Sequence, residues 1–183
     1  MLNDRVARGL LFTGVLSAIL FFQPLHAFSM GLDLTGFQAF SLNNGKALLG
    51  KKLPGKTYTF VAIGFNPARQ KEIELWMEKA LLLNLNRTET PIGVLEMAIV
   101  EEKYKTFRAQ IEPLMKRKIE NKTLLPRVYA GYANHLVLKK SLGIPDKTDT
   151  YYLLCDPQGR VLWKTFSPFN KNDYDTLREK LLH

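Results

Sequence analysis

The chain has 183 residues, of which 46% are hydrophobic and 23% charged, and this length and composition fit one globular domain with a sizeable core. Its one cysteine, Cys155, excludes an intramolecular disulfide, a dithiol redox couple and a cysteine-based zinc site. The formal net charge of +9 favours an anionic partner or acidic lipid head groups.

The first 27 residues have the layout of a secretory signal. A short charged start precedes the apolar stretch Gly9 to Phe22, and a polar segment containing Pro24 ends at Ala27. The apolar stretch is shorter than the about 20 residues that a membrane-spanning helix needs, which favours cleavage. Leu25 is bulkier than the usual residue two places before a cleavage point, so an uncleaved anchor is the alternative. Both alternatives predict an exported protein.

Residues 28–36 are predicted to form a tail, and residues 37–183 the folded domain. The segment FQAFSLNNGKALLG predicts a β-hairpin, because Asn44-Gly45 is a turn sequence that tolerates positive φ and has apolar residues on both sides. The next segment, GKTYTFVAIG, has apolar residues at both alternating sets of positions. It therefore predicts a central strand that is covered on both faces.

A helix is predicted to start at Asn66, a favoured N-cap, with Pro67 at the first helical position. Apolar residues three and four positions apart predict the face that packs on the sheet. This face consists of Ile73, Trp76, Met77, Ala80 and Leu81. The segment IGVLEMAIV then predicts the next strand.

A helical insert is expected at about residues 103–145. Its first helix covers residues 103–119, and Pro113 is expected to kink or interrupt it. A second helix is expected around Tyr132 to Leu142, ended by Gly143 and Pro145.

The last part of the chain has the clearest local signal. TYYLLCDPQGRVLWKTF predicts two strands around a DPQG turn, and NDYDTLREKLL predicts a closing helix capped by Asn172 or Asp173. The resulting order is β-hairpin, β, α, β, helical insert, β, β, α. This order predicts an α/β fold with three layers, α/β/α, around a mixed central sheet.

From about Phe40 to Leu182 the chain resembles the thioredoxin-like superfamily, especially its TlpA and peroxiredoxin-like branch of periplasmic thiol-disulfide proteins. LPGKTYTFVAIGFNPARQKE is similar to the branch's GK…VVLNFWATWCPPCRKE, and TYYLLCDPQGRVLW to its PTTFLIDPDGRI. The segment YANHLVLKKSLGIPDKTDTYYLLCDPQGRVLWKTF is also similar to the mitochondrial ATP synthase assembly factor family founded by yeast Atp ten. The first resemblance implies a periplasmic protein or one anchored facing the periplasm, and the second implies a role in assembly.

The departures from the resemblance bear on chemistry. Asn66 stands where the family has its nucleophilic cysteine, and Arg69 where it has the resolving cysteine. An amide cannot attack a disulfide or carry electrons, so dithiol exchange is excluded at this corner. Thr150 replaces the family's cis-proline, which implies an altered peptide-binding groove. No catalytic residue and no cofactor are assigned.

Cys155 falls at an apolar position of the family's strand and is predicted to be a buried small hydrophobe. The alternative is a reactive thiol in a peroxidase or oxidoreductase. His135 lies on a predicted helix without a cysteine partner, which disfavours a copper chaperone of the Sco type. No metal ligand set is predicted.

The candidate binding corner consists of Asn66, Pro67, Arg69 and Thr150. Arg69 is a cation at a positive helix terminus, which is unfavourable unless an anion compensates for it. Glu72, one turn on, is the simplest such partner. The alternative is a small-anion or metal-binding module in which Arg69 and free N–H groups hold a ligand.

Much of the positive charge lies between Glu101 and Lys140, where ten Lys or Arg residues stand against four Glu. A solvated helical face would explain it, and nucleic acid is not expected because aromatic residues are not interleaved for stacking. The alternative is a partner surface for an acidic protein or anionic lipid, made of Lys116, Arg117, Lys118, Lys139 and Lys140. The sequence thus predicts an exported, redox-inactive protein that acts by protein binding, and the resemblance to the assembly factors implies that it serves the assembly or maturation of a membrane or envelope complex.

Overall fold

The computed structural model describes residues 38–49, 58–86 and 91–182. The predicted leader, residues 1–27, and the predicted tail, residues 28–36, lie outside the described residues. Within the described ranges, no helix is both long enough and apolar enough to span a membrane.

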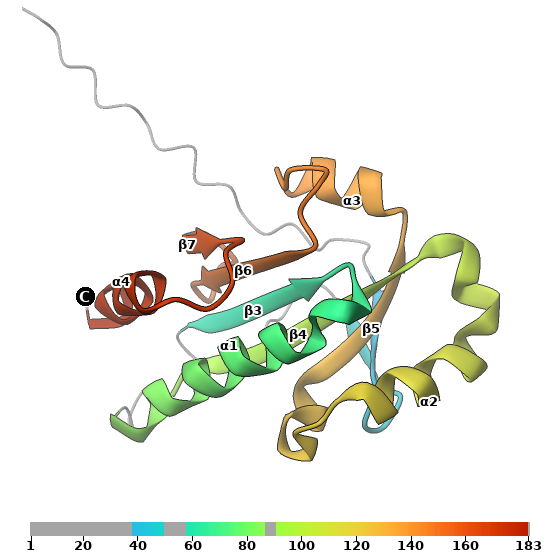
Figure 1. The fold of residues 1–183 in the computed structure, drawn as a ribbon, viewed down its shortest axis with the longest axis horizontal. Helices are drawn as coiled ribbons and strands as arrows, with labels where there is room; N and C mark the ends of the chain where they lie inside the picture. Colours follow the sequence, from blue (N-terminus) through green and yellow to red (C-terminus); the bar gives the residue numbers. More distant parts are fainter. Residues whose placement is uncertain (1–37, 50–57, 87–90, 183) are drawn as a thin grey trace, which may run out of the picture.

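The centre of the molecule is a mixed sheet of seven strands in the order β2-β1-β5-β4-β3-β6-β7 (Figure 1). β3 is parallel to β4, and β4 to β5, whereas the other pairs are antiparallel. The strands are β1 (Gln38–Ser41), β2 (Ala47–Leu49), β3 (Thr59–Gly64), β4 (Gly93–Glu101), β5 (Val128–Ala133), β6 (Thr150–Cys155) and β7 (Val161–Thr165). The predicted hairpin, central strand and final strand pair are all confirmed.

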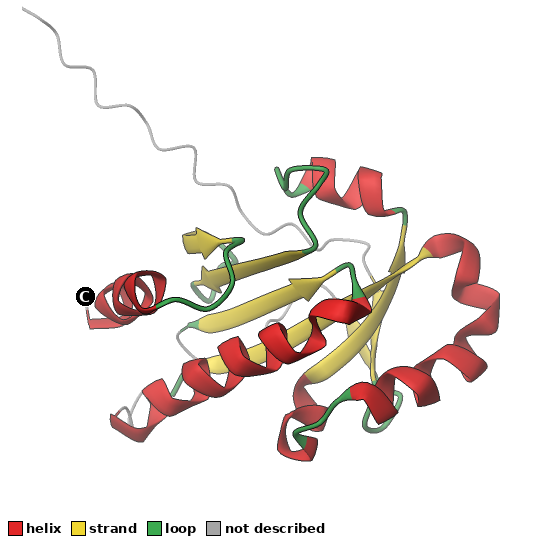
Figure 2. Ribbon diagram, viewed as in Figure 1, coloured by secondary structure: helices red, strands yellow, loops and turns green. Residues whose placement is uncertain are grey.

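Helices cover both faces of this sheet (Figure 2). They are α1 (Gln70–Leu82), α2 (Arg108–Lys118), α3 (His135–Ser141) and α4 (Lys171–Leu182), with 3-10 turns η1 (Pro67–Arg69), η2 (Leu83–Asn86), η3 (Glu102–Phe107) and η4 (Lys122–Arg127). α1, α4 and the end of α2 contribute to one apolar cluster, and α3 with the loop after it contributes to the other. The expected three-layer α/β/α arrangement is therefore confirmed.

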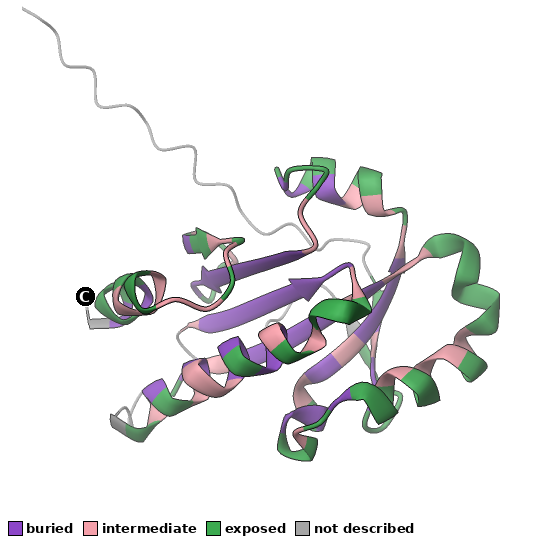
Figure 3. Ribbon diagram, in the orientation of Figure 1, coloured by how far each residue is buried: buried purple, intermediate pink, exposed green. Residues whose placement is uncertain are grey.

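The two apolar clusters hold the layers together. Trp76 on α1 lies among aromatic rings, with ring centroids 5.3 Å from Tyr152 and 5.7 Å from Trp163. β3 is buried along its whole length, as expected for a strand covered on both faces (Figure 3). Helix α1 buries Ile73, Trp76, Met77 and Ala80, as the apolar spacing predicts.

The expectation of a purely helical insert at residues 103–145 is wrong, because the segment contains β5. The second helix begins at His135, not at Tyr132, which belongs to β5. In VYAGYANHLVL the apolar residues fit both the strand and the helix period, so periodicity could not separate the two. β4, α2 and β5 therefore form an ordinary parallel crossover, and α3 connects β5 to β6.

Two local predictions also need correction. α2 continues through Pro113, so the expected interruption does not occur there; the change from 3-10 to α-helix lies earlier, at Phe107–Arg108. The last helix is capped by Asn170, whose Oδ1 accepts from Asp173 N at 2.9 Å. The helix begins at Lys171, so neither Asn172 nor Asp173 can be its N-cap.

Candidate functional site

Asn66 connects the end of β3 to the first helical turn. Its backbone is extended and its Oδ1 accepts a hydrogen bond from Ala68 N at 2.9 Å, as expected for an N-cap followed by Pro67. Its Nδ2 donates to Asp149 Oδ2 at 3.2 Å. Both ends of the Asn66 side chain are thus used, one within the helix start and one toward the residue before β6.

Arg69 lies between two carboxylates. Its Nε is 3.6 Å from Asp149 Oδ2, and its Nη1 is 3.9 Å from Glu72 Oε2. The guanidinium is about half exposed, so each contact is a weak surface interaction. The simple expectation for Arg69, compensation by Glu72, is met, and Asp149 adds a second carboxylate that sequence reasoning missed.

Thr150 joins the same corner through Glu72. Thr150 Oγ1 and the Tyr152 hydroxyl donate to Glu72 Oε1 at 3.2 and 3.0 Å. Burial raises the pKa of the Tyr152 hydroxyl, which stays a neutral donor. The structure therefore brings Asn66, Arg69 and Thr150 into one network with Glu72, Asp149 and Tyr152, and a binding role for this corner stays a prediction.

This network bears on the small-anion alternative. A shallow pocket of about 230 Å³ lies beside Arg69, Glu72, Asp149 and Thr150. The amide of Asn66 and the hydroxyl of Thr150 already donate to carboxylates, so they do not converge on open space. Two carboxylates at the rim would also repel an anion. The corner is suited to holding β6 against the helix start.

Cys155 lies at the other end of the sheet. It pairs with Thr59 at the start of β3, whereas Thr150 pairs with Gly64 at its end, so about 16 Å of strand separates the thiol from the corner. The side chain is fully buried, as predicted for a small hydrophobe. Burial raises the pKa of its thiol to about 12, which keeps it protonated.

The five proposed basic residues do not form one surface. Lys116, Arg117 and Lys118 are exposed at the end of α2, but Lys139 is buried. Its Nζ donates to Asp146 O at 2.8 Å and lies 4.7 Å from the centroid of the Phe65 ring. The expectation for Lys139 is therefore wrong, because its alkyl chain packs inward and its charge is satisfied locally.

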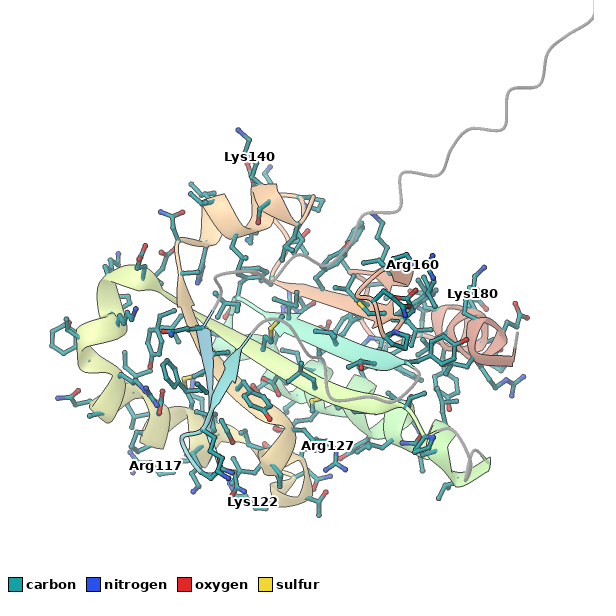
Figure 4. The ribbon with its side chains drawn as sticks, turned by 180° about the vertical axis from the view of Figure 1, so that it is seen from behind. Arg117, Lys122, Arg127, Lys140, Arg160 and Lys180 are labelled. Carbon is teal, nitrogen blue, oxygen red and sulfur yellow. The ribbon has the colours of Figure 1, made fainter. Side chains whose placement is uncertain are left out.

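Lys140 is exposed but lies apart from α2. Figure 4 shows Lys140 at one edge of the molecule, and Arg117 with Lys122 and Arg127 at the opposite edge. The apolar contacts agree, because α2 and α3 pack on opposite faces of the sheet. The basic surface that the structure supports comprises Lys116, Arg117, Lys118, Lys122 and Arg127, and we call it the α2 basic surface.

Metal ligands were not predicted from the sequence. In the part of the chain that the structure describes, no group of three or more His, Cys, Asp or Glu residues is arranged to hold a metal ion. His135 lies near Glu101, with Nδ1 3.4 Å from Oε1, and its Nε2 is 3.2 Å from Ile99 O.

No protein-family model matches the chain, and no curated protein is detectably similar to it in sequence. Several solved structures are similar in fold. Copper-bound ScoI from Arabidopsis thaliana shares 14% identity, covers 80% of this chain and 96% of its own, and has a TM-score of 0.51. Copper-bound yeast Sco1 shares 13% identity, covers 80% of this chain and 90% of its own, and has a TM-score of 0.51.

A third similar structure is the thioredoxin domain of a thiol-disulfide oxidoreductase from Bacteroides vulgatus. It shares 16% identity, covers 80% of this chain and 92% of its own, and has a TM-score of 0.52. At such identities the likeness concerns the fold alone. The similarity to the ATP synthase assembly factors stays a prediction, and the chain has a thioredoxin-like fold.

Proposed function

We propose that this chain is an exported thioredoxin-fold protein that performs no thiol chemistry and acts by binding a protein partner. The observation that carries the proposal is the corner itself, where Asn66 and Arg69 make hydrogen bonds and ion pairs to Asp149 and Glu72. The corner joins structural elements where an active relative has a nucleophile. The solved Sco structures contain copper, but neither residue 66 nor residue 69 of this chain offers a thiolate for it.

The surface proposed for the partner is the outward face of the η3–α2 segment. Phe107 and Leu114 are seven residues apart, about two helical turns, and each exposes about half of its surface, 54% and 51%. Arg117 follows Leu114 by three residues and extends the same face into the α2 basic surface. Exposed apolar side chains beside a cluster of positive charge fit an acidic protein segment with apolar anchors.

A role in assembly or maturation of a membrane or envelope complex rests on the resemblance of the C-terminal half to the assembly factors. Export rests on the leader. Neither the assembly role nor export follows from the geometry. The geometry supports the proposal that the protein acts by binding a partner.

Site-specific crosslinking tests the proposal. A photoreactive phenylalanine analogue at position 107 or 114 of the full chain, expressed in its native host, should give discrete adducts with an envelope protein. The same analogue at Leu85, which is 74% exposed on η2, is the matched control and should give none. A triple variant carries Lys116→Gln, Arg117→Gln and Lys118→Gln. Its adducts should disappear at a lower salt concentration than those of the unmodified chain.

Equal adducts from positions 85 and 107 would mean that the η3–α2 face has no special role. Adducts that form only with lipid would assign this face to the membrane surface and reject the protein partner.

A further inference from the structure

A cavity of about 290 Å³ lies between α1, α2 and the sheet, on the inner side of the helix start. Figure 1 shows α1 and α2 on the same side of the sheet, with β4 and β5 behind them. Most of the cavity lining is apolar and includes Phe65, Ile73, Ile99, Ile111, Met115 and Ile119. The volume is close to the lower end of the roughly 300–1,000 Å³ that ligand pockets occupy.

Glu96 on β4 also lines this cavity and is fully buried. Its neighbours across the sheet are Ala62 and Val128, which offer no polar side chain. Gln70 Nε2 donates to Glu96 Oε2 at 3.2 Å, but Glu96 Oε1 has no hydrogen-bond partner among the described residues. More than nine in ten buried polar groups in proteins have a partner, so this carboxyl oxygen needs an explanation.

The structure assigns this cavity to a small, neutral, largely apolar ligand whose carbonyl or ether oxygen accepts a hydrogen bond from the Glu96 carboxyl. Because Oε2 accepts from Gln70, the acid proton belongs on Oε1, which makes that oxygen a donor. The complementary group is an acceptor, and the apolar walls favour a ligand without charge. Lys118 belongs both to the cavity lining and to the α2 basic surface, but the hydrogen bond from Glu96 does not involve it.

Protonation of Glu96 is consistent with its surroundings. Burial raises its pKa to about 7, the hydrogen bond from Gln70 lowers it and the charge of Glu74 raises it. Glu74 itself accepts from the backbone N–H groups of Glu120 and Asn121 at 3.0 and 2.8 Å.

Other polar groups face the cavity from every element around it. Lys118 on α2 and the pair His135 and Glu101 line it. Tyr104 on η3 lines it as well, and Tyr152 on β6 lies one strand beyond Ala62 in the same row. A pH effect on ligand binding must therefore be assigned with variants of Glu96.

A matched pair of probes tests the inference on the folded chain. 2-Acetylnaphthalene and 2-isopropenylnaphthalene have nearly the same shape, but only the ketone has an acceptor oxygen. At pH 5.5 the ketone should bind about fivefold more tightly, the typical net effect of one hydrogen bond. Its advantage should fall as the pH rises through about 7, where Glu96 loses its proton.

Variants at position 96 test whether Glu96 causes the preference for the ketone and its pH dependence. Glu96→Gln keeps an N–H donor, so it should retain the preference for the ketone without its pH dependence. Glu96→Leu should bind both probes alike. The unmodified chain tests the idea by itself if either variant fails to fold, because the ratio of the two affinities and its pH dependence are both measured there.

Three outcomes would overturn the inference. The first is that neither probe shifts the NMR signals of the cavity residues at its solubility limit, which would mean that water alone occupies the space. The second is equal binding of the two probes to the unmodified chain at pH 5.5. The third is a preference for the ketone that persists in Glu96→Leu, which would place the donor elsewhere.

Discussion

The amide of Asn66 donates to the carboxylate of Asp149 at 3.2 Å, across 83 positions of sequence. The same residue caps the helix start through Oδ1. Asn66→Ala should therefore lower the free energy of unfolding by about 1–3 kcal/mol, the cap supplying about 1 kcal/mol and the bond to Asp149 the rest. Asn66→Ser is the matched control, because serine caps but does not reach Asp149, and it should cost less. Equal losses in urea denaturation would show that the cap contributes nothing, and an unchanged stability in Asn66→Ser would show that the bond to Asp149 contributes nothing.

The purified domain should not catalyse the reduction of insulin or the oxidation of a dithiol peptide above background. Asn66 and Arg69 provide no nucleophile, and Cys155 is buried about 16 Å away along β3. Cys155→Ser is the control. Turnover that disappears with this substitution would establish the thiol enzyme instead, and turnover that persists would point to a non-thiol activity.

Cys155 should react slowly with a thiol reagent in the folded protein and rapidly in denaturant. Burial raises its pKa to about 12, so at pH 8 only about one thiol in ten thousand is ionised, besides being covered. Both rates are followed by the absorbance of the thiolate that the reagent releases. Their ratio measures how strongly the fold protects the Cys155 thiol. Similar rates would mean that the thiol reaches solvent.

Adjacent lysines on α3 offer a comparison of buried and exposed charge. Lys139→Gln should destabilise the fold by about 1–3 kcal/mol, because it removes the bond to Asp146 O and the contact with the Phe65 ring. Lys140→Gln, at an exposed position, should change stability by less than about 0.5 kcal/mol. Thermal unfolding of both variants measures the two effects. If Lys139→Gln leaves stability unchanged, Lys139 behaves as an exposed surface residue.

Local signals predicted much of this fold. Asn66-Pro67, the DPQG turn and the uninterrupted apolar run of β3 each specify their structure over a few residues. β5 was missed because its residues fit two periods, and a six-residue strand followed closely by a helix leaves no long pattern to separate them.

The candidate sites were harder to predict than the fold. Asn66 and Thr150 could be placed at one corner by resemblance, but the hydrogen bonds from Asn66 to Asp149 and from Tyr152 to Glu72 connect residues 83 and 80 positions apart. Glu96 gave a misleading signal, because a glutamate in a strand ordinarily faces water. Only the sheet register shows that it points into the covered face between Ala62 and Val128.

Glu96 should also make stability depend on pH. Burial raises its pKa to about 7 in the folded chain, from the ordinary 4.5 of an exposed glutamate, so the folded state holds the proton more tightly. The stabilisation by this proton is fully present below about pH 4.5 and is lost as the pH rises through about 7, where both states are ionised. The loss is on the order of 3 kcal/mol across that interval. Glu96→Gln cannot titrate and is the control, so the difference in the free energy of unfolding between the two proteins should change by this amount between pH 4.5 and 7. Parallel stability curves for the two proteins in urea would show that Glu96 is ionised in the fold like an exposed carboxylate, and would contradict a neutral acid at the wall of the cavity.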